Sequence, residues 1–251
     1  ILETIEAGKS IVVYGDYDVD GITATSLLYR FLVKMGARVS YYIPERQSEG
    51  YGLNLEALEH IISDGASLVI TVDCGISSYD IVEAVCDRID IIITDHHTAP
   101  PQIPPARAVI NHKQPDCPYR DKNLSGVGVA FKLCQALWLR QCGEWYLDDL
   151  DIVALGTVAD VVPLVGENRI IVQAGLKKMN ELPNLGIDKL IDVAGLHDKT
   201  ITAGHIGFTL APRLNAAGRV THATRAVELL VTDDVDLAET IAQELQETNM
   251  E

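Results

Sequence analysis

The chain has 251 residues, 47% of them hydrophobic and 22% charged, so it can bury a substantial core as one large domain or two small ones. Its formal net charge of −16 argues against a surface that coats nucleic acid in general, but it permits a local basic track or a site where bound metal supplies positive charge. No apolar run reaches the roughly 18 residues of a membrane span. The five cysteines form no C-x-x-C pair, which favours reduced cytosolic thiols over a disulfide frame or a zinc site.

Strand-like and helix-like segments alternate in the first part of the chain. Apolar, β-branched runs predict five strands, at 10–14, 38–43, 67–72, 89–94 and 106–110. Helical spacing of apolar residues predicts three helices between them, at 21–36, 53–65 and 77–88. This alternation indicates an α/β fold with a five-stranded, mostly parallel sheet flanked by helices.

From about residue 125 the pattern turns helical. Plausible helices cover 127–143, 145–160, 168–182, 186–195 and 223–231. We therefore expect one domain over 1–233, with a sheet-bearing part at 1–123 and a helical sub-bundle at 124–233. The last residues, 234–251, look like an unfinished helix, which we expect to be the start of a connector to a further C-terminal domain.

The stretch GDYDVDG, at 15–21, places three aspartates at alternate positions before a glycine. This spacing matches the start of a helix-flanked calcium loop, which needs a glutamate at its twelfth position and a helix in front. Counting from Asp16, the twelfth residue is Leu27, and the preceding run SIVVY is typical of a buried strand. The calcium-loop interpretation therefore fails, yet the three carboxylates still need a positive partner.

Acidic and imidazole side chains follow three of the predicted strands. These residues are Asp16, Asp18 and Asp20 after the first strand, Asp73 after the third, and Asp95, His96 and His97 after the fourth. Taken singly, an aspartate after a strand is usually a helix cap, and paired histidines are often loop residues. Here, however, the groups converge beyond the carboxyl ends of parallel strands, which is where such sheets bind ligands. Crowded carboxylates repel one another unless a cation neutralises them. Oxygen and imidazole ligands without thiolate favour Mn²⁺ or Mg²⁺ over Zn²⁺, and two such ions support in-line displacement at phosphorus.

Seven motifs carry a resemblance to a known family. GDYDVDG, VDCG, TDHH and LGTVADVVPL, in that order, resemble the DHH phosphoesterase superfamily. IPERQSEGYGL at 43–53, LSGVGVAFKL at 124–133 and APRLNAAGRV at 211–220 are similar to its RecJ-type single-strand-specific exonucleases. The resemblance covers nearly the whole chain and implies a catalytic domain with two metal ions, usually Mn²⁺, with Mg²⁺ as the other possibility.

The resemblance also implies roles for individual residues. The expected metal ligands are Asp16, Asp18, Asp20, Asp73, His96 and Asp160, with Asp73 bridging the two ions. The expected catalytic residues are Asp73, Asp95 and His97; His97 would contact the scissile phosphate and Asp95 would orient the histidines. Many superfamily members carry a metal-binding histidine four residues before Asp18, where this chain has Tyr14, which puts full occupancy of one metal site in doubt.

Further residues are expected to contact nucleic acid. They are Arg46, Tyr51, Arg213, Asn215 and Arg219, of which the arginines could instead form ordinary surface ion pairs. Gly126 and Gly128 could bring backbone amides close to a phosphate or form a packing turn.

We expect a two-metal 5′→3′ exonuclease that hydrolyses single-stranded DNA to mononucleotides in DNA repair and recombination. Two alternatives remain open: a phosphodiesterase of the superfamily that cleaves oligoribonucleotides or cyclic dinucleotides, and a non-catalytic replication scaffold related to RecJ. The expected partner is single-stranded DNA, with a helicase or single-strand-binding protein as further candidates. The chain is expected to be a cytoplasmic monomer that binds no membrane. Two domains usual in the family, a DHH-associated C-terminal domain and an oligonucleotide-binding fold, are expected to lie outside it.

Overall fold

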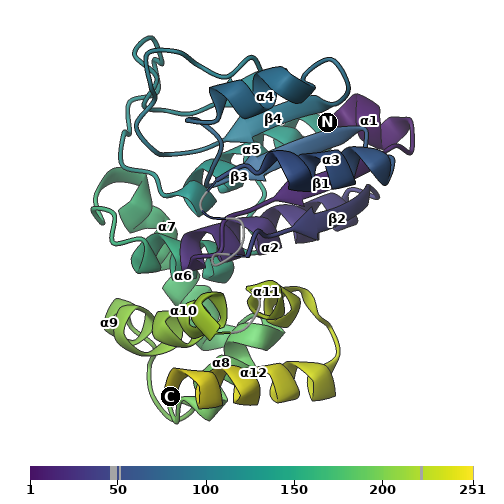
Figure 1. Ribbon diagram of the computed structural model, residues 1–251. Coiled ribbons are helices and arrows are strands. Elements are labelled where there is room, and N and C mark those ends of the chain that lie inside the picture. Colours follow the sequence, from purple (N-terminus) through teal and green to yellow (C-terminus); the bar gives the residue numbers. More distant parts are fainter. Residues whose placement is uncertain (46–49, 51, 221–222, 251) are drawn as a thin grey trace.

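A parallel sheet forms the upper half of the molecule in the computed structural model (Figure 1). The structure describes residues 1–45, 50, 52–220 and 223–250, with only the backbone described at 217–220. The strand order is β2-β1-β3-β4-β5, and every pairing is parallel. The strands are β1 (Ser10–Tyr14), β2 (Arg38–Tyr42), β3 (Leu68–Val72), β4 (Asp90–Thr94) and β5 (Ala108–Ile110). The prediction of a five-stranded sheet is confirmed.

Alternating side chains of the central strand β1 explain why both faces of the sheet are covered. Ile11 and Val13 belong to the hydrophobic cluster that contains α2 (Val19–Lys34) and α5 (Gly126–Cys142). Val12 and Tyr14 belong to a second cluster. That second cluster is built with α3 (Leu55–Ser63) and α4 (Tyr79–Val85). Because successive side chains of a strand point to opposite faces, a strand that is apolar at every position must be buried on both.

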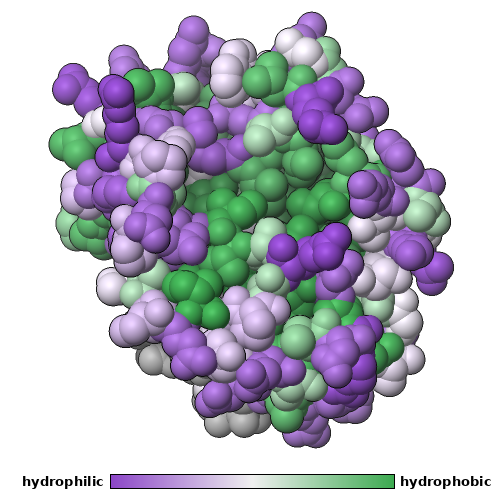
Figure 2. Space-filling view, turned by 90° about the horizontal axis from the view of Figure 1, so that it is seen from above, coloured by the Kyte–Doolittle hydropathy of each residue, from purple (hydrophilic) through white to green (hydrophobic). Residues whose placement is uncertain are grey.

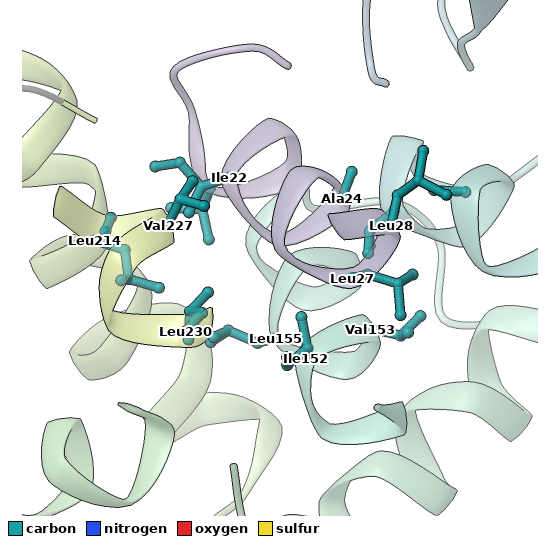
Figure 3. Packing of buried hydrophobic residues seen from close by; sticks show 14 of the residues in the cluster. Ile22, Ala24, Leu27, Leu28, Ile152, Val153, Leu155, Leu214, Val227 and Leu230 are labelled. Carbon is teal, nitrogen blue, oxygen red and sulfur yellow. The ribbon is translucent and has the colours of Figure 1, made fainter. Parts of the chain in front are cut away.

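The larger hydrophobic cluster includes residues of the sheet and of the helical half. Figure 3 shows the part in which α2 packs against helices of that half. Its shared element is α2, which contributes Ile22 and Leu27, while Val153 and Val227 come from two helices of the other half. The remaining helices are α1 (Leu2–Glu6), α6 (Leu150–Ala159), α7 (Gly166–Glu181), α8 (Leu185–Val193), α9 (Ala203–His205), the π-helical turn Ile206–Leu210, α10 (Ala211–Val220), α11 (Thr224–Val231) and α12 (Val235–Met250).

The last helix, α12, packs onto the body of the molecule. Its residues Ala238, Ile241, Ala242 and Leu245 are buried in the main cluster, and the helix lies against α8 and α10. Burial at this helical spacing gives α12 an apolar stripe that anchors it here. Its expected role as a connector to a further domain stays a prediction.

The helix α10 is a feature that periodicity did not reveal. It spans the motif APRLNAAGRV, in which a proline and a glycine weaken a helical pattern. Pro212 comes two residues after the π-helical turn Ile206–Leu210, inside a helical run that begins at Ala203, so its missing N–H group falls next to an irregular turn of the helix. Leu214 is buried in the core. Tertiary packing therefore stabilises a helix that local propensity alone does not favour.

The surface of the molecule is mixed in character. Seen from above (Figure 2), hydrophobic side chains gather in a band across the middle of the face, with mostly hydrophilic side chains around it. Within the part of the chain that the structure describes, no helix has the length and apolar character needed to cross a membrane.

Candidate metal centre

The candidate site lies at the switch point of the sheet. From β1 the chain moves outward to β2, then returns to the other side of β1 to form β3. The loops that follow β1 and β3 therefore diverge and leave a crevice, where open α/β sheets bind ligands. Asp16, Asp73, Asp95 and His96 are all buried there.

Ligand atoms at this edge form three groups that could each hold a cation. The groups are Asp16, Asp18 and Asp73; Asp20, His96 and Asp160; and Asp73, His96 and His97, each with its ligand atoms within 4.8 Å of one another. Because Asp73 and His96 each belong to two groups, the three form one continuous centre. All six residues predicted as metal ligands lie in it.

His96 lies in the middle of the centre. Its Nε2 is 3.1 Å from Asp73 Oδ1 and 3.8 Å from Asp20 Oδ2. Its Nδ1 is 3.7 Å from Asp160 Oδ2, so the carboxylate that follows α6 meets those that follow β1 and β3. Burial, then the neighbouring His97, lowers the pKa of His96 to about 4. A neutral imidazole at neutral pH is the form that binds metal.

The N-terminus of α5 holds Asp20 in position. The amides of Gly126 and Val127 donate to its two carboxylate oxygens at 2.6 and 2.8 Å. Gly126 was interpreted as either an approach to phosphate or a packing turn, and here its amide binds Asp20 instead. It must be a glycine because a Cβ there would lie 2.4 Å from Asp73 Oδ1. Sequence reasoning missed this contact between residues more than a hundred positions apart.

Asp95 fixes His97 through several hydrogen bonds. Its Oδ1 lies 2.7 Å from His97 Nδ1 and accepts from the amides of His96 and His97, while its Oδ2 accepts from the amide of Ile76. The hydrogen bond to Asp95 raises the pKa of His97. Burial opposes ionisation of Asp95, but the bonds from His97 and the backbone outweigh it and lower its pKa. Asp95 therefore contacts the ring and the backbone of His97, but only the backbone of His96.

Asn111, which sequence reasoning did not single out, also holds His97. Its Nδ2 donates to the His97 carbonyl at 2.9 Å, and its Oδ1 accepts from the Lys113 amide at 2.7 Å. Asn111 follows β5 directly and is buried. The only sequence signal for Asn111 was its position directly after a predicted strand. A single uncharged residue at such a position does not by itself indicate a functional site.

Four aspartates of the centre resist ionisation in the metal-free protein. Burial, then the charge of Asp18, raises the pKa of Asp16 to about 7 and that of Asp160 to about 6. Burial, followed by neighbouring carboxylates, raises the pKa values of Asp20 and Asp73 well above their ordinary value. Such shifts mark a site where negative charge awaits a cation.

Buried polar atoms without hydrogen-bond partners, and a strained backbone, also indicate a cation site. Asp73 Oδ1, His96 Nδ1 and Asp160 Oδ2 are buried without a hydrogen-bond partner. Among the described residues, the non-glycine positions with positive φ are Asp73, at 60°, and Val161, at 59°. One is a predicted ligand and the other follows one directly. Buried oxygen and nitrogen atoms of this kind fit divalent metal ions that take carboxylate and imidazole ligands.

Helix capping does not account for two of the aspartates. Asp73 lies well before α4, and Asp160 follows the C-terminal end of α6, where the helix dipole disfavours negative charge. Asp18 does cap α2, because its Oδ1 accepts from the Gly21 amide at 2.9 Å. Asp18 is nevertheless one of the three residues of a group that could hold a cation.

Tyr14, which stands where the family resemblance led us to expect a metal-binding histidine, is a core residue. It is fully buried in the cluster beneath α3 and α4, its ring is 5.2 Å from that of Tyr42, and its hydroxyl donates to the Gly52 carbonyl. The position thus packs the core, and on this side the candidate ligands are Asp16, Asp18 and Asp73.

The predicted DNA-contacting residues are only partly described. Arg213 lies on α10, where its guanidinium donates to Gln246 Oε1 at 2.7 Å and to the Thr209 carbonyl at 2.5 Å, and Asn215 is exposed on the same helix. The other three fall outside the description: Arg46 and Tyr51 entirely, and Arg219 in its side chain. Their roles stay predictions.

The fold and the centre together define an α/β protein with a carboxylate and imidazole site of the kind that can hold divalent cations. The profile described as "DHH family, N-terminal domain" matches residues 10–157, and the chain belongs to this family.

Named relatives are similar over nearly the whole chain. The single-stranded-DNA-specific exonuclease RecJ of Bacillus subtilis is 44% identical, with 100% of this chain and 32% of the relative covered. The protein of the same name from Escherichia coli is 41% identical, with 96% and 44% covered. A crystal structure of exonuclease RecJ bound to manganese aligns with a TM-score of 0.91 and 37% identity, over 99% of this chain and 63% of that one. The chain thus spans less than half the length of these two curated relatives.

Proposed function

We propose that this chain is the catalytic part of a metal-dependent phosphodiesterase that degrades single-stranded DNA from the 5′ end to mononucleotides, in DNA repair and recombination. The single observation that carries the proposal is the centre around His96, in which buried and unpartnered ligand atoms from separate strands converge at the switch point. About 40% identity to proteins named single-stranded-DNA-specific exonucleases supports this substrate.

Two cations, Mn²⁺ or Mg²⁺, are the proposed cofactors. Solved RecJ structures bound to Mn²⁺ and to Mg²⁺ from Thermus thermophilus are similar to this chain. One ion would be held by Asp16, Asp18 and Asp73, and the other by Asp20, His96 and Asp160. When bound, the ions would supply the positive charge that activates water and stabilises negative charge at phosphorus.

The protein's own residues would position the substrate. His97 is held by Asp95 and Asn111, so its imidazole has a fixed orientation beside the ligands, with Nδ1 4.0 Å from Asp73 Oδ1. Its raised pKa favours the protonated ring, which attracts the anionic phosphate. We propose that His97 binds the scissile phosphate and that Asp95 keeps its ring protonated at Nδ1.

The strand itself would be held by the basic and polar residues of two motifs. Arg213, Asn215 and Arg219 belong to one, and Arg46 and Tyr51 to the other. In a chain with a formal charge of −16, such contacts must be local. Action as a cytoplasmic monomer, with a helicase or single-strand-binding protein as partner, remains part of the proposal.

A direct assay separates this function from the alternatives. Single strands labelled at the 5′ end, blunt duplexes, short oligoribonucleotides and cyclic dinucleotides are incubated with the protein and Mn²⁺, and with an excess of chelator. The proposal expects labelled mononucleotides from single-stranded DNA as the main product, and none with chelator. Preferred cleavage of the small substrates would indicate the other phosphodiesterase function. Inactivity on every substrate, by protein that binds Mn²⁺, would indicate the scaffold.

A further inference from the structure

Arg213 on α10 is held by two neutral groups. Its Nε donates to Gln246 Oε1 at 2.7 Å, and its Nη1 donates to the Thr209 carbonyl at 2.5 Å. Within the described part of the chain, no carboxylate pairs with this guanidinium. Two of its nitrogens are therefore fixed, while its positive charge is not neutralised.

Other arginines of this acidic chain pair with carboxylates. Arg88 lies 2.6 Å from Glu59, and Arg225 of α11 lies 2.7 Å from Glu244 of α12. Their hydrogen bonds to these carboxylates raise the pKa of both arginines. In contrast, burial lowers the pKa of Arg213. A partly buried cation without a counter-ion favours the binding of an anion, because that anion offsets the cost of burying the charge.

Gln246 is an uncharged residue on an acidic helix. None of the residues of α12 is basic, and its charged residues are the acidic Asp236, Glu239, Glu244 and Glu247. A glutamate at position 246 could accept the same hydrogen bond from Arg213, but it would also neutralise the guanidinium. The amide of Gln246 therefore supplies an acceptor without a charge.

The position of α10 links this contact to the metal centre. In Figure 1, α10 lies above α12 and below α2 and α6, and it packs against all three of these helices. Asp18 caps the start of α2, and Asp160 directly follows α6. Arg213 thus belongs to a helix that packs on two elements carrying predicted metal ligands, which is a suitable place to hold the same strand.

We propose, on the basis of the function proposed above, that Gln246 is a positioning residue for strand binding. Its side-chain oxygen holds the Arg213 guanidinium in one orientation and leaves the positive charge available to a phosphate of the single strand. Nη2 and the second hydrogen of Nη1 can then donate to that phosphate. Because the side chain is ordered before the strand arrives, binding costs less conformational entropy. The acidic helix α12 thus contributes to strand binding through a residue of α10.

Salt-dependent binding tests the role of Gln246. A fluorescent oligothymidylate is titrated with the protein and followed by anisotropy, with chelator present so that no strand is cleaved. Gln246→Glu keeps the hydrogen bond to Arg213 but neutralises it, and we expect about tenfold weaker binding. The slope of log K against log salt should become shallower by about 0.7, the amount expected for one phosphate contact. Gln246→Ala frees the guanidinium but keeps its charge, so binding should weaken only about threefold, with an unchanged slope.

Steady-state hydrolysis with Mn²⁺ gives a second readout. KM should rise by about tenfold in Gln246→Glu, while kcat stays nearly unchanged because the metal ligands are not altered. A fall in kcat with an unchanged KM would overturn the positioning role.

Two further variants separate positioning from a general effect of charge. Gln243→Glu makes the same substitution on the same helix, at an exposed residue whose side chain donates to Glu247. It should bind the strand like the wild type. In the Arg213→Ala protein, adding Gln246→Glu should change neither the affinity nor the slope, because the residue through which it acts is gone.

The outcomes distinguish this inference from the proposed function. If the wild type cleaves single strands but Gln246→Glu binds them like Gln243→Glu, the positioning role alone is overturned. An effect of Gln246→Glu that persists in the Arg213→Ala protein overturns it as well, because the new carboxylate then repels the strand directly. If the two residues show the expected coupling and no strand is cleaved, the inference stands and the exonuclease function fails. A protein that binds no single strand overturns both.

Discussion

Gly126 and Asp73, more than fifty residues apart in sequence, touch at the metal centre, where a Cβ on Gly126 would stand 2.4 Å from Asp73 Oδ1. The amide of Gly126 also donates to Asp20 at 2.6 Å. One backbone position therefore sets the spacing between two carboxylates that belong to different groups of ligands. The start of α5 packs so closely against Asp73 that the site has no room for any side chain at position 126.

Gly126→Ala should consequently disturb the centre. The added methyl group must displace Asp73 or shift the start of α5, and we expect a loss of about 10–100-fold in Mn²⁺ affinity, as for other residues that orient metal ligands. Gly128→Ala is the matched control, because its Cβ would meet no heavy atom closer than 3.3 Å. Calorimetric Mn²⁺ titration of both variants measures the effect. Equal affinities in the two variants would contradict it.

Asp73→Asn should abolish Mn²⁺-dependent hydrolysis, down to the level of wild-type protein with chelator. The amide keeps the size of the side chain but cannot supply the negative charge that two ions share. Burial and neighbouring carboxylates raise the pKa of Asp73 well above its ordinary value, so the substitution should also raise the melting temperature of the metal-free protein. Activity assays and thermal melts give both readouts, and a folded variant with near-normal activity would refute the assignment.

The metal-free protein should lose stability as the pH rises from about 4 to 8. Asp16 and Asp160 have folded-state pKa values of about 7 and about 6, above the ordinary value of 3.8. The folded state therefore keeps protons that the unfolded chain has lost. Their stabilising effect is fully present below the unfolded pKa and is lost as the pH passes the folded values.

Thermal melts at a series of pH values, with and without Mn²⁺, check this dependence. Mn²⁺ should stabilise the protein more at pH 8 than at pH 5, because protons and cations compete for the same carboxylates. Asp16→Asn retains an oxygen to accept from the Tyr17 amide. It should flatten the pH dependence of the metal-free protein near pH 7, and an unchanged profile would exclude Asp16 as its source.

Asn111→Ala should slow hydrolysis by about 10–100-fold while leaving Mn²⁺ affinity nearly unchanged, because it loosens His97 and touches no carboxylate of the centre. Single-turnover rates and Mn²⁺ titrations on the same preparation separate the two effects. A parallel loss of metal affinity would show that Asn111 acts on the centre as a whole.

Arg219→Ala tests the expected phosphate contact. Its affinity for single strands should fall alike for all sequences, and the dependence of log K on log salt should become shallower by about 0.7, the amount expected for one phosphate contact. Arg88→Ala is the control, since Arg88, in the turn after α4, pairs with Glu59 of α3 at 2.6 Å. If both variants keep the wild-type slope, Arg219 is an ordinary surface residue.

The sequence by itself determined the parts of this protein that depend on local pattern. Apolar, β-branched runs identified all five strands, and charged residues after β1, β3 and β4 located the site at one edge of the sheet. Because parallel strands present their carboxyl ends together, local signals were enough to predict that Asp20, Asp73 and His96 would meet. Ordered motifs then brought in Asp160 from the helical half.

Only the tertiary structure decided how these residues are held. The bond from Gly126 to Asp20 joins α5 to α2, and the bond from Asn111 to His97 joins β5 to the loop after β4. Neither has a periodic signal, because each depends on how two elements pack. Packing likewise made a helix of the motif that contains Pro212, and it placed Gln246 beside Arg213. Local sequence encodes which elements form, whereas the distances between side chains arise only when distant elements share one core.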